Sequence, residues 1–170
     1  MAKAKAPPFK STGYWLLKSE AETYSIDQFK KDKKTLWTGV RNYQARNFMV
    51  DSMKPGEKFV FYHSSSEPSA AVGLGEITKV NQPDPTAWDK KDEYHDPKAT
   101  KDAPIWYCAE VAYKGHLARP VSLPELRAEP RLEKMALLQR GQRLSILPLT
   151  KEEYELIVAM SEPQALERNA

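Results

Sequence analysis

One large ring and several directional hydrogen-bonding groups are concentrated in residues 37–49, WTGVRNYQARNFM. They surround the predicted start of a short helix, where backbone N–H groups can bind carbonyl or phosphate oxygens while a ring stacks on a flat ligand. Trp37 is that ring, and a core position is the alternative interpretation. Asn42 and Arg46 share one helix face. The planar guanidinium groups of Arg41 and Arg46 suit phosphates and base edges better than lysine does.

Polar side chains also end two predicted strands, as KSE at 18–20 and YHSS at 62–65. Each cluster fits either a satisfied strand end or the wall of a pocket. Gly73 and Gly75 fall on one face of a predicted strand, which indicates a bulge, a close approach of another group to the backbone, or both. The gathering of these features at strand ends and one helix N-terminus favours a single pocket for a flat, polar ligand.

The residues that most often catalyse reactions form no recognisable constellation. His63, His95 and His116 lack metal-ligand spacing, and no phosphate-binding loop or dinucleotide fingerprint is found. Cys108, the one cysteine, lies within an apolar strand and is expected in the core. A nuclease or base-modifying hydrolase that pairs His63 with Glu20 is the enzymatic alternative.

The charge distribution favours a polyanionic partner over a membrane. Residues 1–62 hold twelve Lys and Arg against six Asp and Glu, whereas residues 63–110 hold five against nine. A basic first third gains affinity for nucleic acid by releasing phosphate counterions, although a solvated surface is the simpler explanation. No apolar run reaches bilayer-spanning length, and no export signal is found in the first thirteen residues.

The pattern of elements predicts an α+β domain with a mixed, strongly curved sheet or small barrel and helices outside. Strands are expected at 14–20, 58–65, 70–80, 105–113 and 142–149. Capping pairs predict helices beginning at Ser25/Gln28, Ser122/Glu125 and Thr150/Glu153. Asn42 caps another helix, whose inward stripe is Ala45, Phe48, Met49 and Met53. The predicted organisation is a disordered basic tail (1–13), one domain (14–162) and a C-terminal tail (163–170), with a long surface excursion at 81–104.

Five motifs in the same order, YWLLKSE, WTGVRNYQARNFM, KFVFYHSS, PDPTAWD…YHDPKA and RLSILPL, closely resemble the EVE domain family over roughly residues 14–160. The resemblance implies a PUA-like curved β-barrel flanked by short helices. It also implies a non-enzymatic reader of modified bases in DNA or RNA, with 5-methylcytosine derivatives among the ligands and no cofactor or metal. An intracellular location is expected because a single cysteine fits a reducing compartment, and it would be cytoplasmic or, in a eukaryote, nuclear. A monomer is expected, although no residue pattern sets the oligomeric state.

The same resemblance assigns roles to individual residues. Trp37 would stack the base, and Arg41 or Arg46 would contact the backbone or a base edge. The remaining pocket residues would be Lys18, Ser19, Thr38, Gly39, Val40, Asn42, Tyr62, His63 and Ser64. Three departures from the family pattern affect ligand choice: Ala21 replaces a proline, Ser65 an asparagine and Leu147 a glutamine. A third hypothesis is a protein-interaction module that uses Trp88 and Tyr94 of the 81–104 segment.

Overall fold

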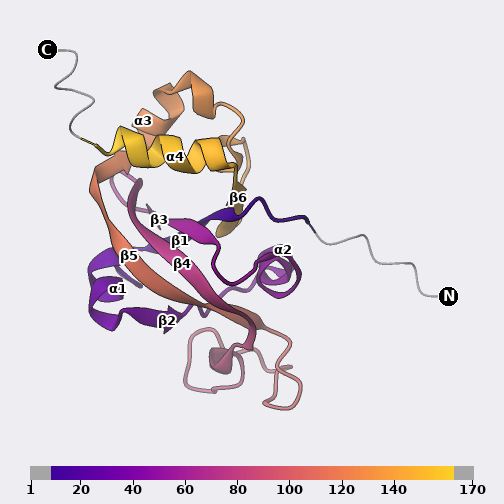
Figure 1. The fold of residues 1–170 in the computed structure, drawn as a ribbon. Helices are drawn as coiled ribbons and strands as arrows, with labels where there is room; N and C mark the ends of the chain where they lie inside the picture. Colours follow the sequence, from indigo (N-terminus) through magenta and orange to yellow (C-terminus); the bar gives the residue numbers. More distant parts are fainter. Residues whose placement is uncertain (1–8, 163–170) are drawn as a thin grey trace, which may run out of the picture.

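Figure 1 shows the computed structural model, which describes residues 9–162. The elements in chain order are β1 (Tyr14–Glu20), α1 (Ile26–Asp32), β2 (Lys34–Leu36), α2 (Tyr43–Asn47), β3 (Lys58–Ser64), β4 (Ala70–Pro83), β5 (Tyr107–Ser122), α3 (Leu123–Ala128), β6 (Ile146–Leu149) and α4 (Lys151–Met160). The predicted order is confirmed, with the short strand β2 as an addition. The predicted tails lie outside the described residues at 1–8 and 163–170.

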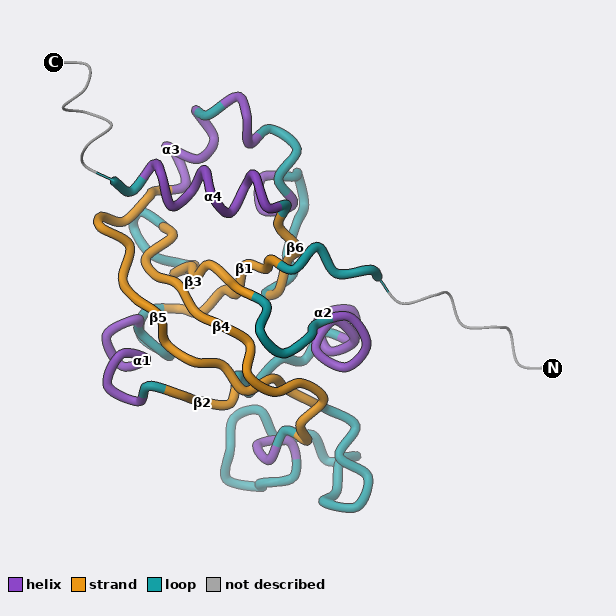
Figure 2. Tube along the Cα trace, in the orientation of Figure 1, coloured by secondary structure: helices purple, strands orange, loops and turns teal. Residues whose placement is uncertain are grey.

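The strands form one mixed six-stranded sheet in the order β2-β5-β4-β3-β1-β6. β1 and β3 are parallel, and the other neighbouring pairs are antiparallel. β4 and β5 run through the molecule as long bent strands (Figures 1 and 2). Several register shifts interrupt their pairing, and such bulges bend a sheet. The expected curved, mixed sheet with helices outside is therefore confirmed.

The parallel strands β1 and β3 are buried on both faces, and their side chains alternate between two hydrophobic layers. In β1, Trp15 and Leu17 enter the layer beneath α1 and α2, while Leu16 enters the layer beneath α3 and α4. In β3, Phe59 and Phe61 enter the first layer, whereas Val60 and Tyr62 enter the second. Because both faces of each strand are buried, β1 and β3 have continuous apolar runs and not an alternation of apolar and polar residues. The same alternation decides which residues can reach the site described below.

Glycine makes this packing possible on β4. A Cβ at Gly73 would lie 2.3 Å from the Ile26 side chain, and one at Gly75 would lie 2.2 Å from the Phe59 ring. Both predicted explanations hold, since register shifts also occur beside these glycines. The groups that approach the backbone come from the protein's own core.

The helices begin where the capping pairs predict. Ser122 with Glu125 and Thr150 with Glu153 form complete capping boxes, while the Ser25 side chain accepts from the Gln28 N–H. Asn42 caps α2, whose last turn continues as a π-helical turn over Phe48–Ser52. Within residues 9–162, no helix combines the length and the apolar character needed to cross a bilayer.

Candidate functional site

A cavity of about 760 Å³ opens at one edge of the sheet, within the range of sites that hold small ligands. Eight of the twelve residues predicted for the site line it: Lys18, Ser19, Trp37, Thr38, Gly39, Val40, Arg41 and Ser64. Ten further residues complete the lining: Glu20, Thr23, Tyr24, Thr35, Leu36, Ser65, Glu93, Tyr94, Arg143 and Ser145. The walls thus combine rings, hydroxyls and charges of both signs.

Parallel pairing brings the first group of lining residues together. Ser19 lies opposite His63, and Glu20 lies opposite Ser64, so the C-terminal ends of β1 and β3 meet at the same edge. The N–H of Lys18 donates to the carbonyl of Ser145, 2.8 Å away, which adds the segment before β6 to the wall. Burial lowers the pKa of the Lys18 ammonium from its ordinary value.

Trp37 belongs to the core and to the cavity wall at once. Its side chain is 7% exposed, and its ring lies nearly perpendicular to the rings of Tyr24 and Phe61, at interplanar angles of 89° and 83°. Its backbone N–H donates to the carbonyl of Ala109 over 2.8 Å, which fixes the segment that follows β2. The two interpretations of Trp37 are therefore compatible: the residue is part of the hydrophobic core and also lines the cavity.

The indole N–H of Trp37 is free for a ligand. It has no hydrogen-bond acceptor among the described residues, where every fully buried side-chain nitrogen and oxygen has a partner. The Nε1 atom therefore keeps some accessible surface, and Trp37 is one of the residues that line the cavity. This N–H lies in the plane of the indole, so it suits an acceptor at the rim of the ring, beside a ligand that stacks on the indole face.

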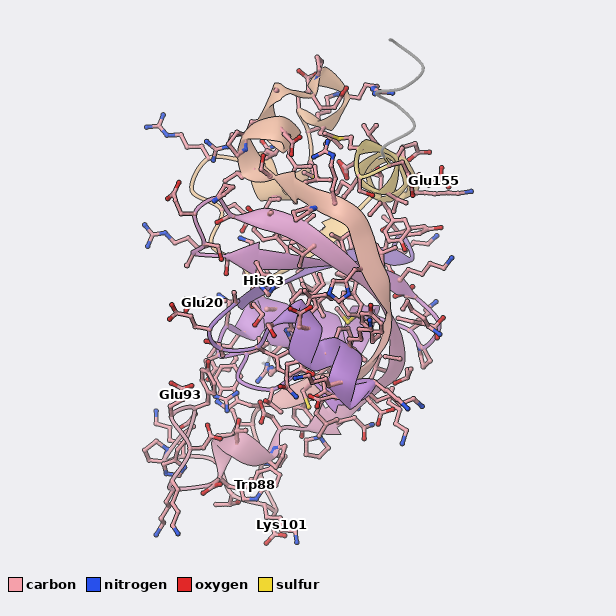
Figure 3. All side chains as sticks on the ribbon, turned by 90° about the vertical axis from the view of Figure 1, so that its left-hand side faces the viewer. Glu20, His63, Trp88, Glu93, Lys101 and Glu155 are labelled. Atoms are coloured by element: carbon pink, nitrogen blue, oxygen red, sulfur yellow. The ribbon has the colours of Figure 1, made fainter. Side chains whose placement is uncertain are left out.

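Tyr94 lines the cavity beside Gly39, from a position 57 residues further along the chain than Trp37. A Cβ at Gly39 would lie 2.8 Å from the Tyr94 ring, and the φ of Gly39 is +85°, so only glycine fits there. Burial, reinforced by the carboxylates of Glu93 and Glu20, raises the pKa of the Tyr94 phenol, which stays protonated. Figure 3 shows Glu20 and Glu93 on the same side of the molecule, on different segments.

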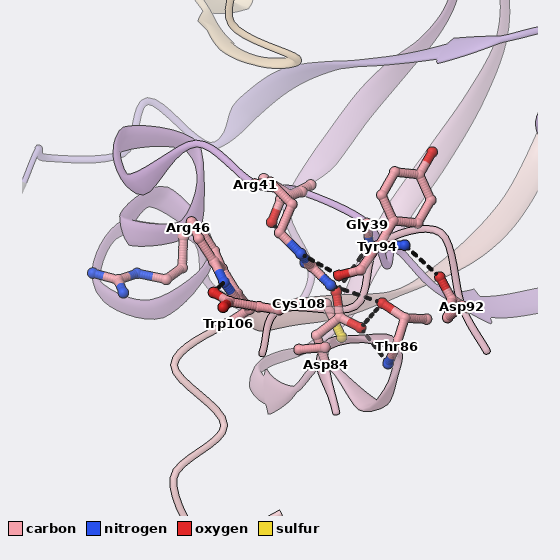
Figure 4. A network of polar contacts seen from close by, with 12 residues as sticks. Gly39, Arg41, Arg46, Asp84, Thr86, Asp92, Tyr94, Trp106 and Cys108 are labelled. Carbon is pink, nitrogen blue, oxygen red and sulfur yellow. Dashed lines mark hydrogen bonds and ion pairs between the residues drawn. The ribbon is translucent and has the colours of Figure 1, made fainter. Parts of the chain in front are cut away.

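Arg41 holds the 81–104 segment against this wall (Figure 4). Its guanidinium donates to the Tyr94 carbonyl at 2.9 Å, the Asp84 carboxylate at 3.0 Å and the Thr86 hydroxyl at 2.9 Å. Asp84 is fully buried and also accepts from the Gly39 N–H over 2.9 Å. Arg41 therefore lines the cavity, and its main contacts join residues 37–41 to the 81–104 segment.

Four residues predicted for the site do not line the cavity. The Asn42 side chain is occupied in capping α2, where it accepts from the Ala45 N–H. Tyr62 is buried beneath α3 and α4 because strand alternation turns it away from the cavity. Arg46 donates to the carbonyl of Ile105 and to Asn47.

His63, the fourth, lies behind the wall and connects it to α1. The N–H of Ile26 donates to its Nε2 atom at 3.3 Å, and its Nδ1 atom lies 3.2 Å from the Ser19 carbonyl. A backbone N–H can only donate, so Nε2 must accept and Nδ1 must carry the proton. Both ring nitrogens are therefore used in positioning Ser19 and α1.

The additional lining residues carried little signal in the sequence. Tyr24 and Thr35 come from a loop and from β2, a three-residue strand that exists because it pairs with β5. Tyr94 lies in a proline-rich segment with no period. Gly39 was the available clue, because a glycine between two side chains of an ordered wall indicates a close neighbour.

Known proteins share this chain's sequence and fold. The model of the EVE domain family matches residues 13–160. Human thymocyte nuclear protein 1 is 37% identical over 90% of this chain and 76% of its own length. A crystal structure of a Pseudomonas syringae protein superposes with a TM-score of 0.83 at 40% identity, covering 88% of this chain and 99% of that one.

A second solved relative carries a ligand. The crystal structure of human THYN1 protein in complex with 5-methylcytosine-containing DNA has a TM-score of 0.81 at 37% identity, covering 88% of this chain and 97% of that chain. The family match spans most of the chain, and the solved relatives share its fold. This chain belongs to the EVE domain family.

Proposed function

We propose that this chain is a non-enzymatic reader of a modified base in nucleic acid, which it takes into the cavity beside Trp37. The observation that carries the proposal is the cavity itself, whose lining combines the ring of Trp37 with hydroxyls and backbone groups. The complex of human THYN1 protein with 5-methylcytosine-containing DNA supports DNA and a 5-methylcytosine derivative as the first ligands to test.

In the proposed mechanism, the polar groups of the cavity wall all find hydrogen-bond partners with the modified base but not with other bases. Extruding a base from a duplex costs a few kcal/mol, and stacking on a ring such as Trp37 returns about 1–3 kcal/mol. The wall then selects among bases, because a mismatched ligand leaves donors or acceptors unpaired in a confined space. The substituent on the modified base fills space that the unmodified base leaves empty.

Binding without turnover is supported by the state of the catalytic candidates. Neither ring nitrogen of His63 is free to take a proton from a substrate. Burial raises the pKa of the Cys108 thiol to about 12, which keeps it from acting as a thiolate. In residues 9–162, no group of three or more His, Cys, Asp or Glu side chains is placed to hold a metal.

The 81–104 segment also fits better as part of the cavity than as a separate protein-docking module. Tyr94 is engaged against Gly39, and Trp88 packs on a small cluster with Ala87 and Trp106. As a reader of nucleic acid, the chain would act wherever that polymer is found, in the cytoplasm or, in a eukaryote, the nucleus.

The test compares Trp37→Phe with Trp15→Phe in binding to matched oligonucleotides with 5-methylcytosine or cytosine, as single strands and duplexes, at two salt concentrations. Trp15 is a matched control, because it is a buried indole of the same hydrophobic layer whose N–H is bonded to Glu57 at 2.9 Å. Trp37→Phe keeps a ring in the core but removes the N–H and part of the flat surface.

We expect Trp37→Phe to weaken binding of the modified oligonucleotide about tenfold or more, with little change for the unmodified one. The dependence of affinity on salt should be unchanged, because that component comes from phosphate contacts. Trp15→Phe should preserve the preference. Equal losses on both oligonucleotides in the Trp37 variant would contradict the proposal.

A further inference from the structure

An aromatic stack lies outside the cavity, at the start of α2. The rings of Tyr43 and Trp106 are 4.8 Å apart and inclined by 22°, which is a stacked arrangement. Trp106 is buried, whereas Tyr43 is 59% exposed. An exposed tyrosine backed by a buried indole is a rigid platform, because one of its faces is already held in place.

The chain is strained to present this platform. Trp106 Nε1 donates to the Asp96 carboxylate at 2.8 Å, and the Trp106 backbone N–H donates to the carbonyl of Pro104 across Ile105. Ile105 has a φ of +61°, which a β-branched residue rarely adopts. This tight turn aims the indole at Tyr43, and such strain is characteristic of functional positions.

Arg46 completes the platform without covering it. Its guanidinium carbon is 4.7 Å from the centre of the Tyr43 ring and 5.8 Å from that of Trp106. Arg46 therefore lies close to both rings, and more than half of Tyr43 is still exposed with the guanidinium in place.

Arg46 also has hydrogen-bonding capacity left for a ligand. Three of its five N–H groups donate to protein acceptors, namely the Ile105 carbonyl and the Asn47 side chain. Two N–H groups are not used by any described residue. A partly held guanidinium beside an open ring offers a charge-assisted contact to a phosphate next to a stacked base.

Arg41 joins this platform to the cavity. Its guanidinium carbon is 5.3 Å from the centre of the Trp106 ring, and the same side chain lines the cavity. We propose that Tyr43 stacks a second base of the strand whose modified base occupies the cavity, with Arg46 beside the intervening backbone. This inference rests on the proposed function, and it identifies the partner as a strand of nucleic acid with an unpaired base beside the one that is read.

The test measures Tyr43→Ala and the matched Tyr43→Trp against free 5-methylcytidine, a short single-stranded oligonucleotide containing 5-methylcytosine, and its cytosine counterpart. Tyr43→Ala should weaken binding of both oligonucleotides by about 5- to 150-fold and to the same extent, the range seen when a stacking ring is truncated. Binding of the free nucleoside should not change. Tyr43→Trp should retain oligonucleotide affinity, because the flat surface is kept.

Unchanged oligonucleotide affinity in Tyr43→Ala would overturn the inference and would leave a protein partner as the occupant of the platform. A loss that also appears with the free nucleoside would overturn it, because the residue would then act through the cavity. Oligonucleotide binding by the unaltered chain without preference for 5-methylcytosine would instead refute the proposed function, while a Tyr43→Ala loss on the cytosine strand would still support the platform.

Discussion

The two layers of this domain are stabilised in different ways. The layer under α3 and α4 depends on contacts between residues close in sequence. Complete capping boxes at Ser122 and Thr150 begin the two helices, which cover an apolar cluster. The cavity side is held by polar pairs distant in sequence, above all Arg41 with Asp84 and Arg41 with the carbonyl of Tyr94. Local capping fixes the starts of α3 and α4, whereas the long-range polar contacts join separate segments and leave room for a ligand between them.

Removing the central acceptor of the cavity side should have the largest effect. In Asp84→Ala, the half-buried Arg41 loses its carboxylate and the Gly39 N–H loses its acceptor. Breaking a buried ion pair from one side costs about 3–5 kcal/mol of unfolding free energy. Denaturant unfolding measures this loss, and oligonucleotide binding under conditions where the variant is folded should show a loss of preference for the modified base.

Leu126→Ala is the matched change in the closed layer. Leu126 is the fully buried residue of α3, and its truncation leaves a cavity that costs about 2–5 kcal/mol of unfolding free energy. The folded variant should bind modified and unmodified oligonucleotides as the unaltered chain does. If Leu126→Ala abolished the preference as fully as Asp84→Ala, the two layers would not be functionally distinct.

A smaller effect is expected from replacing Gly39, with Gly56 as the control. Both have positive φ, +85° and +93°, and an alanine in that region costs about 1–2 kcal/mol. A Cβ at Gly56 meets nothing within 4 Å, whereas one at Gly39 would collide with Tyr94. Thermal unfolding should show that both alanine variants are destabilised, Gly39→Ala more than Gly56→Ala because of the added collision, and only Gly39→Ala should displace Tyr94 and weaken ligand binding. Unaltered binding in Gly39→Ala would indicate that Tyr94 is no part of the wall.

The structural features that could be predicted from the sequence are those set by residues adjacent in the chain. Helix starts at Ser25, Asn42, Ser122 and Thr150 follow from capping chemistry, which is local. The inward stripe Ala45, Phe48, Met49 and Met53 is buried throughout, although the helix changes to a π-helical turn at Phe48. That change was not predictable, because a stripe specifies which residues face the core and not which backbone hydrogen bonds they make.

The parts of the candidate site that depend on residues close in sequence, or on neighbouring strands, were also predictable. Residues 37–41 form one continuous motif, and the strand ends at Ser19 and Ser64 meet through parallel pairing. Tyr94 was not predicted to line the cavity, because its contact with Gly39 joins two segments far apart in the sequence and no residue pattern relates them. Tyr62 and His63 were expected in the lining, yet the first faces the α3 and α4 layer and the second is used behind the wall.

The most direct measurement follows the side-chain N–H signals of the four tryptophans by NMR while a short oligonucleotide containing 5-methylcytosine is added. We expect the Trp37 indole signal to shift saturably, and far less with the cytosine counterpart, because Trp37 lines the cavity and its N–H has no acceptor among the described residues. The signal of Trp15, already bonded to Glu57, should not move. A Trp37 signal that stays unchanged while the oligonucleotide binds would show that the modified base does not bind beside Trp37.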